Sequence, residues 1–403
     1  MTDGTGRTPD IVCVSTNHWT GLPTSKQHLT WVFSRTGRVL YVDPPIDVFS
    51  TFGRFRRWPK LRGLRNVREH AWVLSPLVLA SSSSPMSRLA FHRRAASRVR
   101  AVCDRLGFER PVLWTFTPEH RPYAGALGES LVVYHVADDL PAMSRDPGAM
   151  AELERAHVKV ADVLFVVSEA LLDKVRHTGK AHRLPNAADA RHFRRVLAGD
   201  EDASMESFTE AVTRPSRVPP EFEGARRPIL LYGGATYQWF DTELFLELAG
   251  RRPDWTFALV GPTKGRLSRG GLPHNVLPVG RRSYDEFPWY VANADVAIMP
   301  WRDDDITRNA DPIGLYEYLL CGKPVVASPF PAALERGGLV RTATTAAGFA
   351  DAVVDALDED GASEEALARM RFGFENTWEK RAQEALDHIA AVLAKRRREG
   401  GSG

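Results

Sequence analysis

Short apolar runs alternate with longer stretches of helical periodicity along the first half of this chain. Helical patterns at 86–106 and 147–159 lie between such runs. Apolar runs separated by amphipathic helices are typical of βαβ units, which build parallel sheets. We therefore predict an α/β domain over residues 1–195. Its predicted strands are 11–14, 39–42, 112–116, 131–136 and 163–167.

A second series of the same kind occupies residues 228–375. Between the two series, residues 196–227 hold many acidic, Pro and Ser residues and little apolar periodicity, which favours a linker or a surface insertion. Residues 376–403 predict a helix that packs back on the N-terminal domain, followed by a flexible Gly-Ser tail. The second series predicts strands at 229–232, 256–260, 276–279, 296–299, 325–327 and 339–341.

Composition indicates an ordinary soluble protein of about two domains. The 403 residues are 43% hydrophobic and 26% charged, and no apolar run reaches the length that a membrane span needs. Residues 1–10 lack the apolar core of a secretory signal. The three cysteines form no CxxC pair, which favours reduced thiols in the cytoplasm over disulfides or zinc. A net charge of +3 is too small to argue for nucleic acid as a partner.

One segment of the chain is strongly basic and aromatic, with no acidic residue before Glu69. A loop of this kind suits an anionic membrane surface, so we predict a possible peripheral contact with the inner face of the cell membrane. The alternative is a solvated, arginine-rich loop. The basic residues are Arg54, Arg56, Arg57, Lys60, Arg62, Arg65 and Arg68, and the aromatic ones are Phe49, Phe52, Phe55 and Trp58.

The sequence DPIGLYEYLLCGKPVVAS at 311–328 predicts a helix, a glycine stop and a buried strand. Asp311 is expected to cap the helix, and Pro312 suits its first turn. A helix that begins beside a parallel sheet offers unpaired amides and a positive dipole end to an anion. Glu317 is placed to accept hydrogen bonds from a diol such as a ribose. Phosphate and sugar together indicate a nucleotide ligand.

Glycines and arginines follow other predicted strands of the second series. Gly233 and Gly234 end the first of these strands, where glycine lets the backbone approach a pyrophosphate, although a tight turn explains them equally well. Arg281 and Arg282 follow another strand, and a planar guanidinium binds phosphate through two hydrogen bonds. The sequence does not decide which of the two arginines is a plain surface charge.

An ordered set of motifs resembles the family 4-type (group 1) glycosyltransferases of the GT-B fold, with a closer likeness to the bacterial branch of teichuronic-acid-type enzymes. The likeness covers nearly the whole chain except 196–227 and the two ends. The motifs are VLYVDPP (39–45), VVYHVADDLPAM (132–143), ADVLFVVSEALLDK (161–174), LPNAADARHF (184–193), LLYGGATYQWFD (230–241), RPDWTFALVGP (252–262), VGRRSYDEFPWYVANADV (279–296) and residues 294–328.

The resemblance implies an α/β protein with two Rossmann-like parallel-sheet domains that face a central cleft. The domain at 228–375 would bind the nucleotide-sugar, and the domain at 1–195 would receive the acceptor. Glu317 would bind the ribose hydroxyls, and Gly21 would let its loop approach the diphosphate, although a simple loop glycine explains it nearly as well. The amides that would face phosphate or donor sugar belong to Ile313, Gly314, Leu315 and Tyr316.

Four polar residues follow strands of the N-terminal domain and are candidates for contact with the acceptor or for general-base catalysis. They are His120, His135, Asp138 and Asp139. Asp139 also suits a helix cap, and Asp138 also suits a pair with an arginine. A lone histidine is more often structural than catalytic.

The sequence departs from the family pattern in its charges. Asn309 stands where many relatives carry a second glutamate, and Gly314 stands where closer relatives carry a lysine. Residues 236–240 lack the usual Arg and Lys. Charge neutralisation must then come from elsewhere, and the candidates are Arg302, Arg308, Lys264 and Arg281.

We predict a cytoplasmic glycosyltransferase that moves a sugar from a UDP- or GDP-type donor to a hydroxyl acceptor, such as a cell-envelope, exopolysaccharide or lipid-linked glycan precursor. We expect no cofactor and no metal, because the acidic run 303–305 reads as a solvated loop. Two alternatives stay open: a GT-B-like sugar-nucleotide 2-epimerase, and a degenerate subunit that binds nucleotide-sugar without turnover. A dinucleotide-dependent oxidoreductase is disfavoured, since no GxGxxG follows a predicted strand.

Overall fold

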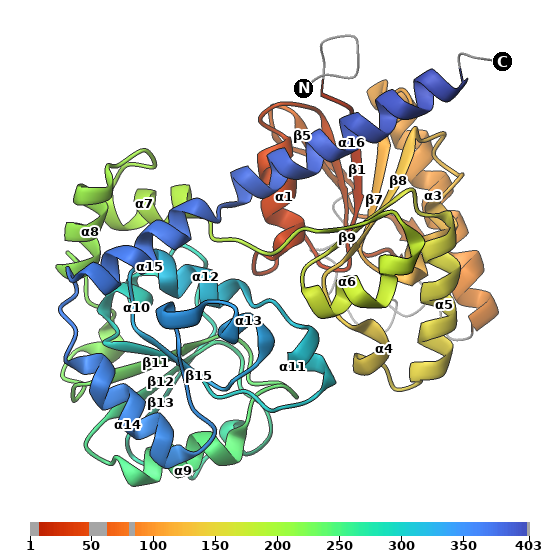
Figure 1. The fold of residues 1–403 in the computed structure, drawn as a ribbon. Helices are drawn as coiled ribbons and strands as arrows, with labels where there is room; N and C mark the ends of the chain where they lie inside the picture. Colours follow the sequence, from red (N-terminus) through yellow and green to blue (C-terminus); the bar gives the residue numbers. More distant parts are fainter. Residues whose placement is uncertain (1–7, 48–62, 80–84, 401–403) are drawn as a thin grey trace. The chain divides into compact units, whose positions relative to one another are not determined.

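The computed structural model describes residues 8–47, 63–79 and 85–400 (Figure 1). The chain divides into two compact units. Unit 1 comprises Met1–Pro185 and Glu379–Gly403, and unit 2 comprises Asn186–Trp378. The last helix, predicted from residue 376 on, is α16 (Trp378–Gly400), and its residues from Glu379 belong to unit 1.

Unit 1 is built on an 8-stranded sheet in the order β10-β9-β8-β7-β1-β2-β5-β4. Its pairs are parallel except β4 with β5, which is antiparallel. The strand pair β4–β5 was not predicted, because β4 lies within the basic segment and its arginines obscure the apolar pattern of a strand. The strands are β1 (Ile11–Val14), β2 (Val39–Val42), β4 (Leu64–Arg68), β5 (Ala71–Leu74), β7 (Val112–Thr115), β8 (Leu131–Val136), β9 (Val163–Val166) and β10 (Ala181–Arg183), with β3 (Ile46–Asp47) and β6 (Leu77–Val78) in a separate pair.

Helices cover both faces of this sheet (Figure 1). On one face, apolar side chains of α3 pack into a core with alternate residues of the central strands. On the other face, Phe33 lies 5.2 Å from Trp114, and His388 of α16 lies 5.8 Å from Phe165, measured between ring centroids. The helices of unit 1 besides α16 are α1 (Ser25–Phe33), α3 (Pro85–Leu106), α4 (Leu140–Met143), α5 (Pro147–Val160) and α6 (Glu169–Val175).

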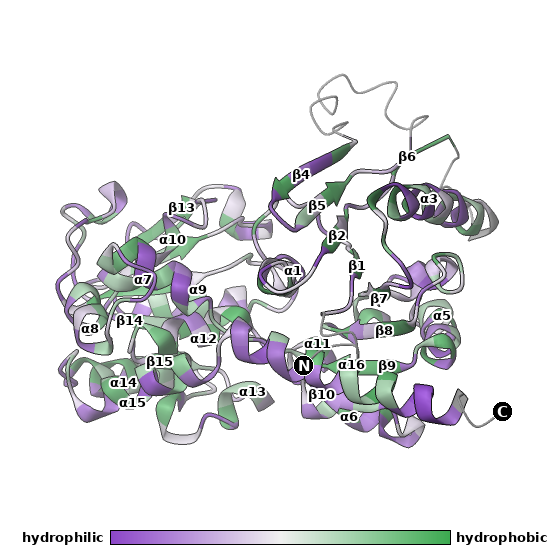
Figure 2. Cartoon of the chain, turned by 90° about the horizontal axis from the view of Figure 1, so that it is seen from above, coloured by the Kyte–Doolittle hydropathy of each residue, from purple (hydrophilic) through white to green (hydrophobic). Residues whose placement is uncertain are grey.

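Unit 2 is built on a 6-stranded parallel sheet in the order β13-β12-β11-β14-β15-β16. Its inner strands are nearly continuous in apolar residues, as expected for a sheet covered on both faces (Figure 2). The strands are β11 (Ile229–Gly233), β12 (Thr256–Val260), β13 (Val276–Gly280), β14 (Val296–Met299), β15 (Val325–Ala327) and β16 (Arg341–Thr342). The strand predicted at 339–341 is displaced, since Gly337–Leu339 is a 3-10 turn.

The helices of unit 2 connect these strands and enclose its core. They are α7 (Ala190–Ala198), α8 (Met205–Thr213), α9 (Thr242–Arg251), α10 (Phe287–Asn293), α11 (Asp305–Asn309), α12 (Ile313–Leu320), α13 (Pro331–Leu334), α14 (Ala346–Leu357) and α15 (Glu364–Glu375). Two Rossmann-like parallel sheets with helices on their faces confirm the predicted α/β class.

Of the two alternatives predicted for 196–227, a linker or a surface insertion, the structure disfavours the linker. This segment contains α8 and a 3-10 turn at Pro220–Phe222, and it belongs to unit 2. Phe208, Val212 and Phe222 are buried in the core of unit 2. These three buried residues are separated by Pro, Ser and acidic residues, so the sequence shows too few apolar positions to predict a helix here.

No helix among the described residues is long and apolar enough to cross a membrane. Most of the basic and aromatic segment predicted to touch a membrane falls in 48–62, outside the described residues. Of its charges, Arg65 and Arg68 are described and lie on β4.

Candidate functional site

The candidate site of unit 2 is centred on the start of α12, which follows the carboxyl end of β14 along the chain. The helix begins at Ile313, after Pro312. Asp311 does not cap it, contrary to the prediction: its buried carboxylate accepts hydrogen bonds from the Asn186 amide (2.7 Å), the Tyr316 hydroxyl (3.0 Å) and Arg336 (3.3 Å). Asp311 therefore anchors the segment before the helix to three other parts of unit 2.

The first turn of α12 has fewer open amides than the sequence suggested. The Leu315 amide donates to the Pro312 carbonyl at 3.1 Å, and the side chains of Leu315 and Tyr316 are buried in the core. The amides of Ile313 and Gly314 have no carbonyl within the helix to bind, since they belong to its first turn. Anion binding at this terminus would therefore depend on Ile313 and Gly314.

Glycines bring the end of β11 close to this helix start. A Cβ at Gly314 would lie 3.6 Å from the Gly233 carbonyl, and the Gly233 amide donates to the Tyr318 hydroxyl at 2.6 Å. A Cβ at Gly233 would come within 2.5 Å of Phe287, so this position needs glycine. The predicted glycine loop and the predicted helix start thus form one region.

Gly261, which the sequence prediction missed, supports this loop from the next strand. Gly234 has φ +150°, and a Cβ there would face the Tyr232 hydroxyl at 3.4 Å. A Cβ at Gly261 would lie 2.1 Å from the Gly234 carbonyl oxygen. Gly261 directly follows buried β12 within the motif ALVGP, which is the same signal that identified Gly233 after β11.

Glu317 lies in the second turn of α12 with only 6% of its surface exposed. It accepts a hydrogen bond from the Tyr284 hydroxyl at 3.1 Å. Burial raises the pKa of Glu317 to about 7, and the Asp189 charge adds to the rise, while the Tyr284 bond opposes it. A carboxylate held at its titration point near neutral pH is a functional candidate on physical grounds.

Tyr284 is itself fixed by the start of unit 2. Its ring stacks on His192 of α7 with centroids 4.1 Å apart and planes 14° apart, and His192 Nε2 lies 2.9 Å from the Tyr284 carbonyl. Tyr284 sits in the quoted motif GRRSYDEF, but nothing in the sequence distinguishes its hydroxyl from that of an ordinary loop tyrosine.

The two arginines after β13 have different environments. Arg282 donates to the Tyr290 hydroxyl at 2.8 Å and forms an ion pair with Glu221, so it ties the 3-10 turn at Pro220–Phe222 to α10. Arg281 is exposed and makes no ion pair within the described part of the chain. Of the pair, Arg281 is left as the candidate for a phosphate.

The other cations proposed to neutralise a diphosphate are also placed. Arg308 pairs with Asp303 at 2.9 Å and with Asp305 at 3.3 Å, so the acidic run 303–305 balances it. Lys264 is exposed and lies 3.9 Å from the centroid of the Tyr237 ring, and Arg302 is exposed. Asn309 is buried, and its amide donates to the Asp305 carbonyl at 2.6 Å, so it helps to end α11.

The histidines predicted in unit 1 are buried and weakly basic. His135 lies on β8 between the rings of Trp114 and Phe116, with centroid distances of 5.8 and 5.2 Å. Burial lowers its pKa to about 3, and burial likewise puts the pKa of His120 well below the ordinary value. A group with so low a pKa is a poor general base at neutral pH.

The two aspartates after β8 differ in role: Asp139 stabilises the fold, and Asp138 lies exposed on the surface. Asp139 is the N-cap of α4, where it accepts from the Ala142 amide at 3.2 Å, and it pairs with Lys174. Asp138 is exposed. Gly21 lies in the exposed loop between β1 and α1, where its amide donates to the His18 carbonyl at 2.9 Å. Asp138 is therefore the ionisable candidate whose side chain makes no hydrogen bond or ion pair with a described residue.

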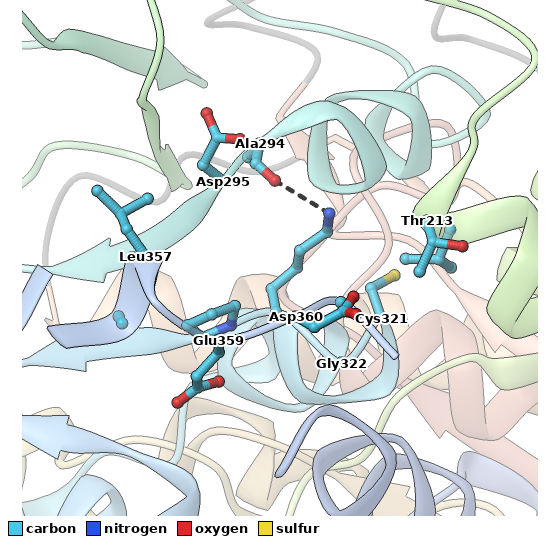
Figure 3. A pocket seen from close by; sticks show the side chains of 13 residues that line it. Thr213, Ala294, Asp295, Cys321, Gly322, Leu357, Glu359 and Asp360 are labelled. Atoms are coloured by element: carbon cyan, nitrogen blue, oxygen red, sulfur yellow. Dashed lines mark hydrogen bonds between the residues drawn. The ribbon is translucent and has the colours of Figure 1, made fainter. Parts of the chain in front are cut away.

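Within the described residues, no group of three or more His, Cys, Asp or Glu side chains could hold a metal ion. Among the described surfaces of unit 2, a separate cavity of about 250 Å³ lies where β14 and β15 begin (Figure 3). Lys323 at this cavity donates to the carbonyls of Ala292 (2.6 Å) and Ala294 (3.0 Å), and burial lowers its pKa to about 8. None of the predicted site residues lines this cavity.

Comparisons with known proteins bear on the family and the fold of this chain. Residues 228–359 match the family model described as glycosyl transferases group 1. Over 229 residues the chain is 27% identical to the Bacillus subtilis (strain 168) protein named "Putative teichuronic acid biosynthesis glycosyltransferase TuaH", and the match spans 55% of this chain and 56% of that protein. The chain thus spans about half the length of this curated relative.

Solved structures show the fold over nearly the whole chain. Sucrose-phosphate synthase from Thermosynechococcus elongatus superposes with a TM-score of 0.68 at 14% identity, covering 96% of this chain and 100% of that one. Anabaena HepE, solved in complex with UDP and glucose, superposes with a TM-score of 0.62 at 15% identity over 95% and 100% of the two chains. At these identities the likeness establishes the fold, which is GT-B as the sequence predicted.

Proposed function

We propose that this chain, whose residues 228–359 form a group 1 glycosyl transferase domain within a GT-B fold, moves a sugar from a nucleoside-diphosphate donor of UDP or GDP type to a hydroxyl acceptor. One observation carries the proposal. Unit 2 combines a buried carboxylate on α12 with open amides at the start of the same helix and a glycine-lined strand end beside it. Glu317 suits the ribose diol, and the amides suit the diphosphate.

The geometry supports an electrostatic contribution to catalysis. When the bond between the anomeric carbon and the diphosphate oxygen breaks, negative charge develops on the leaving diphosphate. The amides of Ile313 and Gly314, the positive end of α12 and the exposed Arg281 would stabilise that charge. The acceptor hydroxyl forms the new bond, and Asp138 is the candidate to take its proton. We propose that none of these steps needs a metal or a cofactor.

We further propose that the acceptor is a cell-envelope glycan precursor. The printed name of the Bacillus subtilis relative places that protein in teichuronic acid biosynthesis. The complex of HepE with UDP-glucose supports a nucleotide-sugar as the donor class. The name of one protein thus supports the proposed acceptor class, and the bound molecule of the other supports the proposed donor class.

A donor panel scored by nucleotide release tests the proposal. UDP-, GDP-, dTDP- and ADP-linked sugars are incubated with the full chain, with and without a cell-envelope lipid extract. We expect one base to be preferred and release to depend on the extract. Glu317→Ala should lose at least about tenfold in nucleotide affinity, because two hydrogen bonds to the diol are removed. Glu375→Ala, at an exposed position of the same unit, is the matched control and should bind like the wild type.

Other outcomes of this panel favour the alternatives. Conversion or hydrolysis of the donor without any acceptor would favour a sugar-nucleotide 2-epimerase. Nucleotide binding without turnover in any arm would favour a degenerate binding subunit. If no nucleotide binds at millimolar concentration, the proposal fails.

We also propose that the protein works in the cytoplasm at an anionic membrane surface, and α3 supports this part of the proposal. Six of its arginines are exposed, and Asp104 is its only acidic residue. Arg100 pairs with Asp104 at 2.9 Å, whereas Arg93, Arg98 and Arg105 form no ion pair with a described residue. Small exposed residues at 90, 97 and 101 separate the cations, so the helix can approach a lipid surface closely.

Vesicle binding tests the membrane part separately. The full chain is mixed with vesicles of phosphatidylglycerol and phosphatidylcholine or of phosphatidylcholine alone. We expect binding only to the anionic vesicles, and we expect the Arg93→Glu/Arg98→Glu/Arg105→Glu variant to lose it. The control reverses three exposed cations elsewhere, Arg145→Glu/Lys159→Glu/Arg269→Glu. Equal binding by both triple variants would remove α3 from the proposal.

A further inference from the structure

Unit 1 buries a lysine where its central strands end. Lys26 is the second residue of α1, whose start is fixed by Gln27: the side-chain oxygen of Gln27 accepts from the Thr24 amide (3.1 Å) and hydroxyl (2.8 Å). Only 7% of Lys26 is exposed. Its ammonium lies 5.0 Å from the centroid of the Phe116 ring, directly after β7. The capping bonds fix the backbone at the start of α1, from which the Lys26 side chain extends to Phe116.

Three features of this position disfavour a lysine in the absence of a ligand. A cation in the first turn of a helix opposes the helix dipole. A buried ammonium loses its hydration. No carboxylate within ion-pair distance and no hydrogen-bond acceptor binds the Lys26 ammonium in the described part of the chain. A buried lysine without a partner is rare in a structural role, because the usual solution is a paired carboxylate.

Among the described neighbours of Lys26, only the exposed carboxylate of Asp138 supplies negative charge, and it acts from beyond ion-pair distance. His135 contacts the same Phe116 ring as Lys26, with 5.2 Å between the His135 and Phe116 ring centroids. Both His135 nitrogens are buried without a hydrogen-bond partner. The low pKa values of His135 and His120, lowered further by the Lys26 charge, keep both rings neutral. The buried thiol of Cys13 is neutral because burial raises its pKa to about 12. Asp138 is close enough to favour the charged lysine, but it is exposed and makes no contact with it.

We propose that Lys26 is the centre of an anion-binding subsite in unit 1, which holds an oxyanion of the acceptor, either a phosphate or a carboxylate, beside the hydroxyl that is glycosylated. The inference rests on the proposed transferase function. It adds that the acceptor is an acidic glycan or a phosphorylated precursor rather than a neutral sugar. The oxyanion provides the partner that Lys26 lacks, and the ring of Phe116 shields the pair on one side.

Calorimetry and thermal unfolding of the full chain test this subsite with three small probes: glucose 6-phosphate, glucuronate and glucose, at constant ionic strength. We expect one or both anionic probes to bind and raise Tm, and glucose to have no effect. Lys26→Met should weaken the anionic probe at least tenfold, whereas Lys26→Arg should retain part of its affinity. Lys159→Met, at an exposed lysine of the same unit, is the matched control and should bind the probe like the wild type. The response to phosphate against carboxylate identifies the acceptor class.

Nucleotide binding, measured in parallel, separates the two claims. We expect Lys26→Met to bind the preferred nucleotide as the wild type does, because Lys26 belongs to unit 1 and Glu317 to unit 2. Loss of nucleotide affinity in Lys26→Met would overturn the inference, because the lysine would then serve the donor. It is also overturned if neither anionic probe binds the wild type, or if the response persists in Lys26→Met. Failure of the wild type to bind any nucleotide would instead overturn the proposed function.

Discussion

The start of α1 in unit 1 and the start of α12 in unit 2 each place the side chain of a charged residue type in a buried position, and the two charges are opposite. Both helices lie at the edge where parallel strands end, and each carries a buried side chain of a charged residue type in its first two turns: Lys26 in α1 and Glu317 in α12. Glu317 of α12 accepts a hydrogen bond from Tyr284, whereas the Lys26 ammonium of α1 donates no hydrogen bond to a described residue. Glu317 therefore has a hydrogen-bond partner within unit 2, whereas Lys26 has none among the described residues.

Under the two proposals, this difference separates the ligands that the units would take. In unit 2, Glu317 would accept hydrogen bonds from a neutral diol, and the helix start would supply the positive field for a diphosphate. In unit 1, the Lys26 cation would take an anion. Ligand binding would then stabilise each unit against unfolding.

The largest expected effect is the change in unfolding free energy when Glu317 is replaced by glutamine. The raised pKa of Glu317 contributes stability that is complete below its ordinary value of 4.5 and is lost as the pH rises through about 7. Glu317→Gln lacks this dependence, so at pH 8.5 it should exceed the wild type by up to about 3 kcal/mol in unfolding free energy while binding nucleotide poorly. Denaturant titrations at pH 4.5 and 8.5 measure the difference. A variant with the same pH slope as the wild type would contradict the assignment.

The next effect concerns the glycine loop on which α12 depends. Gly261→Ala would place a Cβ 2.1 Å from the Gly234 carbonyl, in a backbone with φ +147°, and should lose about 3 kcal/mol of stability together with nucleotide affinity. Gly314→Ala meets only an ordinary contact at 3.6 Å and should fold like the wild type. Urea denaturation of both variants checks this contrast, and equal losses would rule out the steric explanation.

A smaller effect of opposite pH sign belongs to Lys26. Burial lowers the pKa of Lys26, so its contribution to stability is complete above the ordinary value of 10.5 and is lost as the pH falls through the lowered value. Lys26→Met should therefore gain about 1–2 kcal/mol at pH 7, because a buried unpaired ammonium is replaced by an apolar side chain. Thermal unfolding at pH 7 and 10 should show the gain shrinking with pH. A destabilised Lys26→Met would mean that the lysine has a partner after all.

The smallest effect separates two adjacent arginines. Arg281→Ala should weaken nucleotide binding about fivefold with stability unchanged, since this side chain is exposed. Arg282→Ala should instead lose about 1 kcal/mol of stability, because Glu221 and Tyr290 lose their partner, and should bind nucleotide normally. Calorimetry and urea denaturation of both variants test the assignment, and the reverse pattern would exchange the two roles.

The fold was predictable because its strands are continuous apolar runs. β1, β2, β8 and β12 coincide with predicted runs, since strands buried on both faces carry their signal in local composition. The helix at 205–213 was missed because only two of its residues, Phe208 and Val212, enter the core. A local sequence pattern therefore predicts segments in which nearly every residue is buried better than segments in which only a few residues are buried.

At the candidate site, the sequence allowed predictions only from single residues in a local pattern. Glycines after strands and a glutamate after a helix start led by proline are such patterns, and their ligand roles stay predictions. Asp311 and Arg282 were misjudged because their partners, Asn186 and Glu221, lie 125 and 61 positions away. Lys26 was not recognised at all, since a lysine beside Gln27 and His28 reads as an exposed helix residue. Its burial comes from tertiary packing that no local pattern contains.

The anchoring of Asp311 links the crossover between the units to the nucleotide end of α12. The first residue of unit 2, Asn186, grips Asp311 through both its backbone amide and its side-chain amide, which donates to the Asp311 carbonyl at 2.5 Å. A change in chain direction at Pro185 would therefore pull on the turn that precedes Ile313. The residue at which the chain enters unit 2 and the turn that precedes α12 are thus tied together by two hydrogen bonds between residues 125 positions apart.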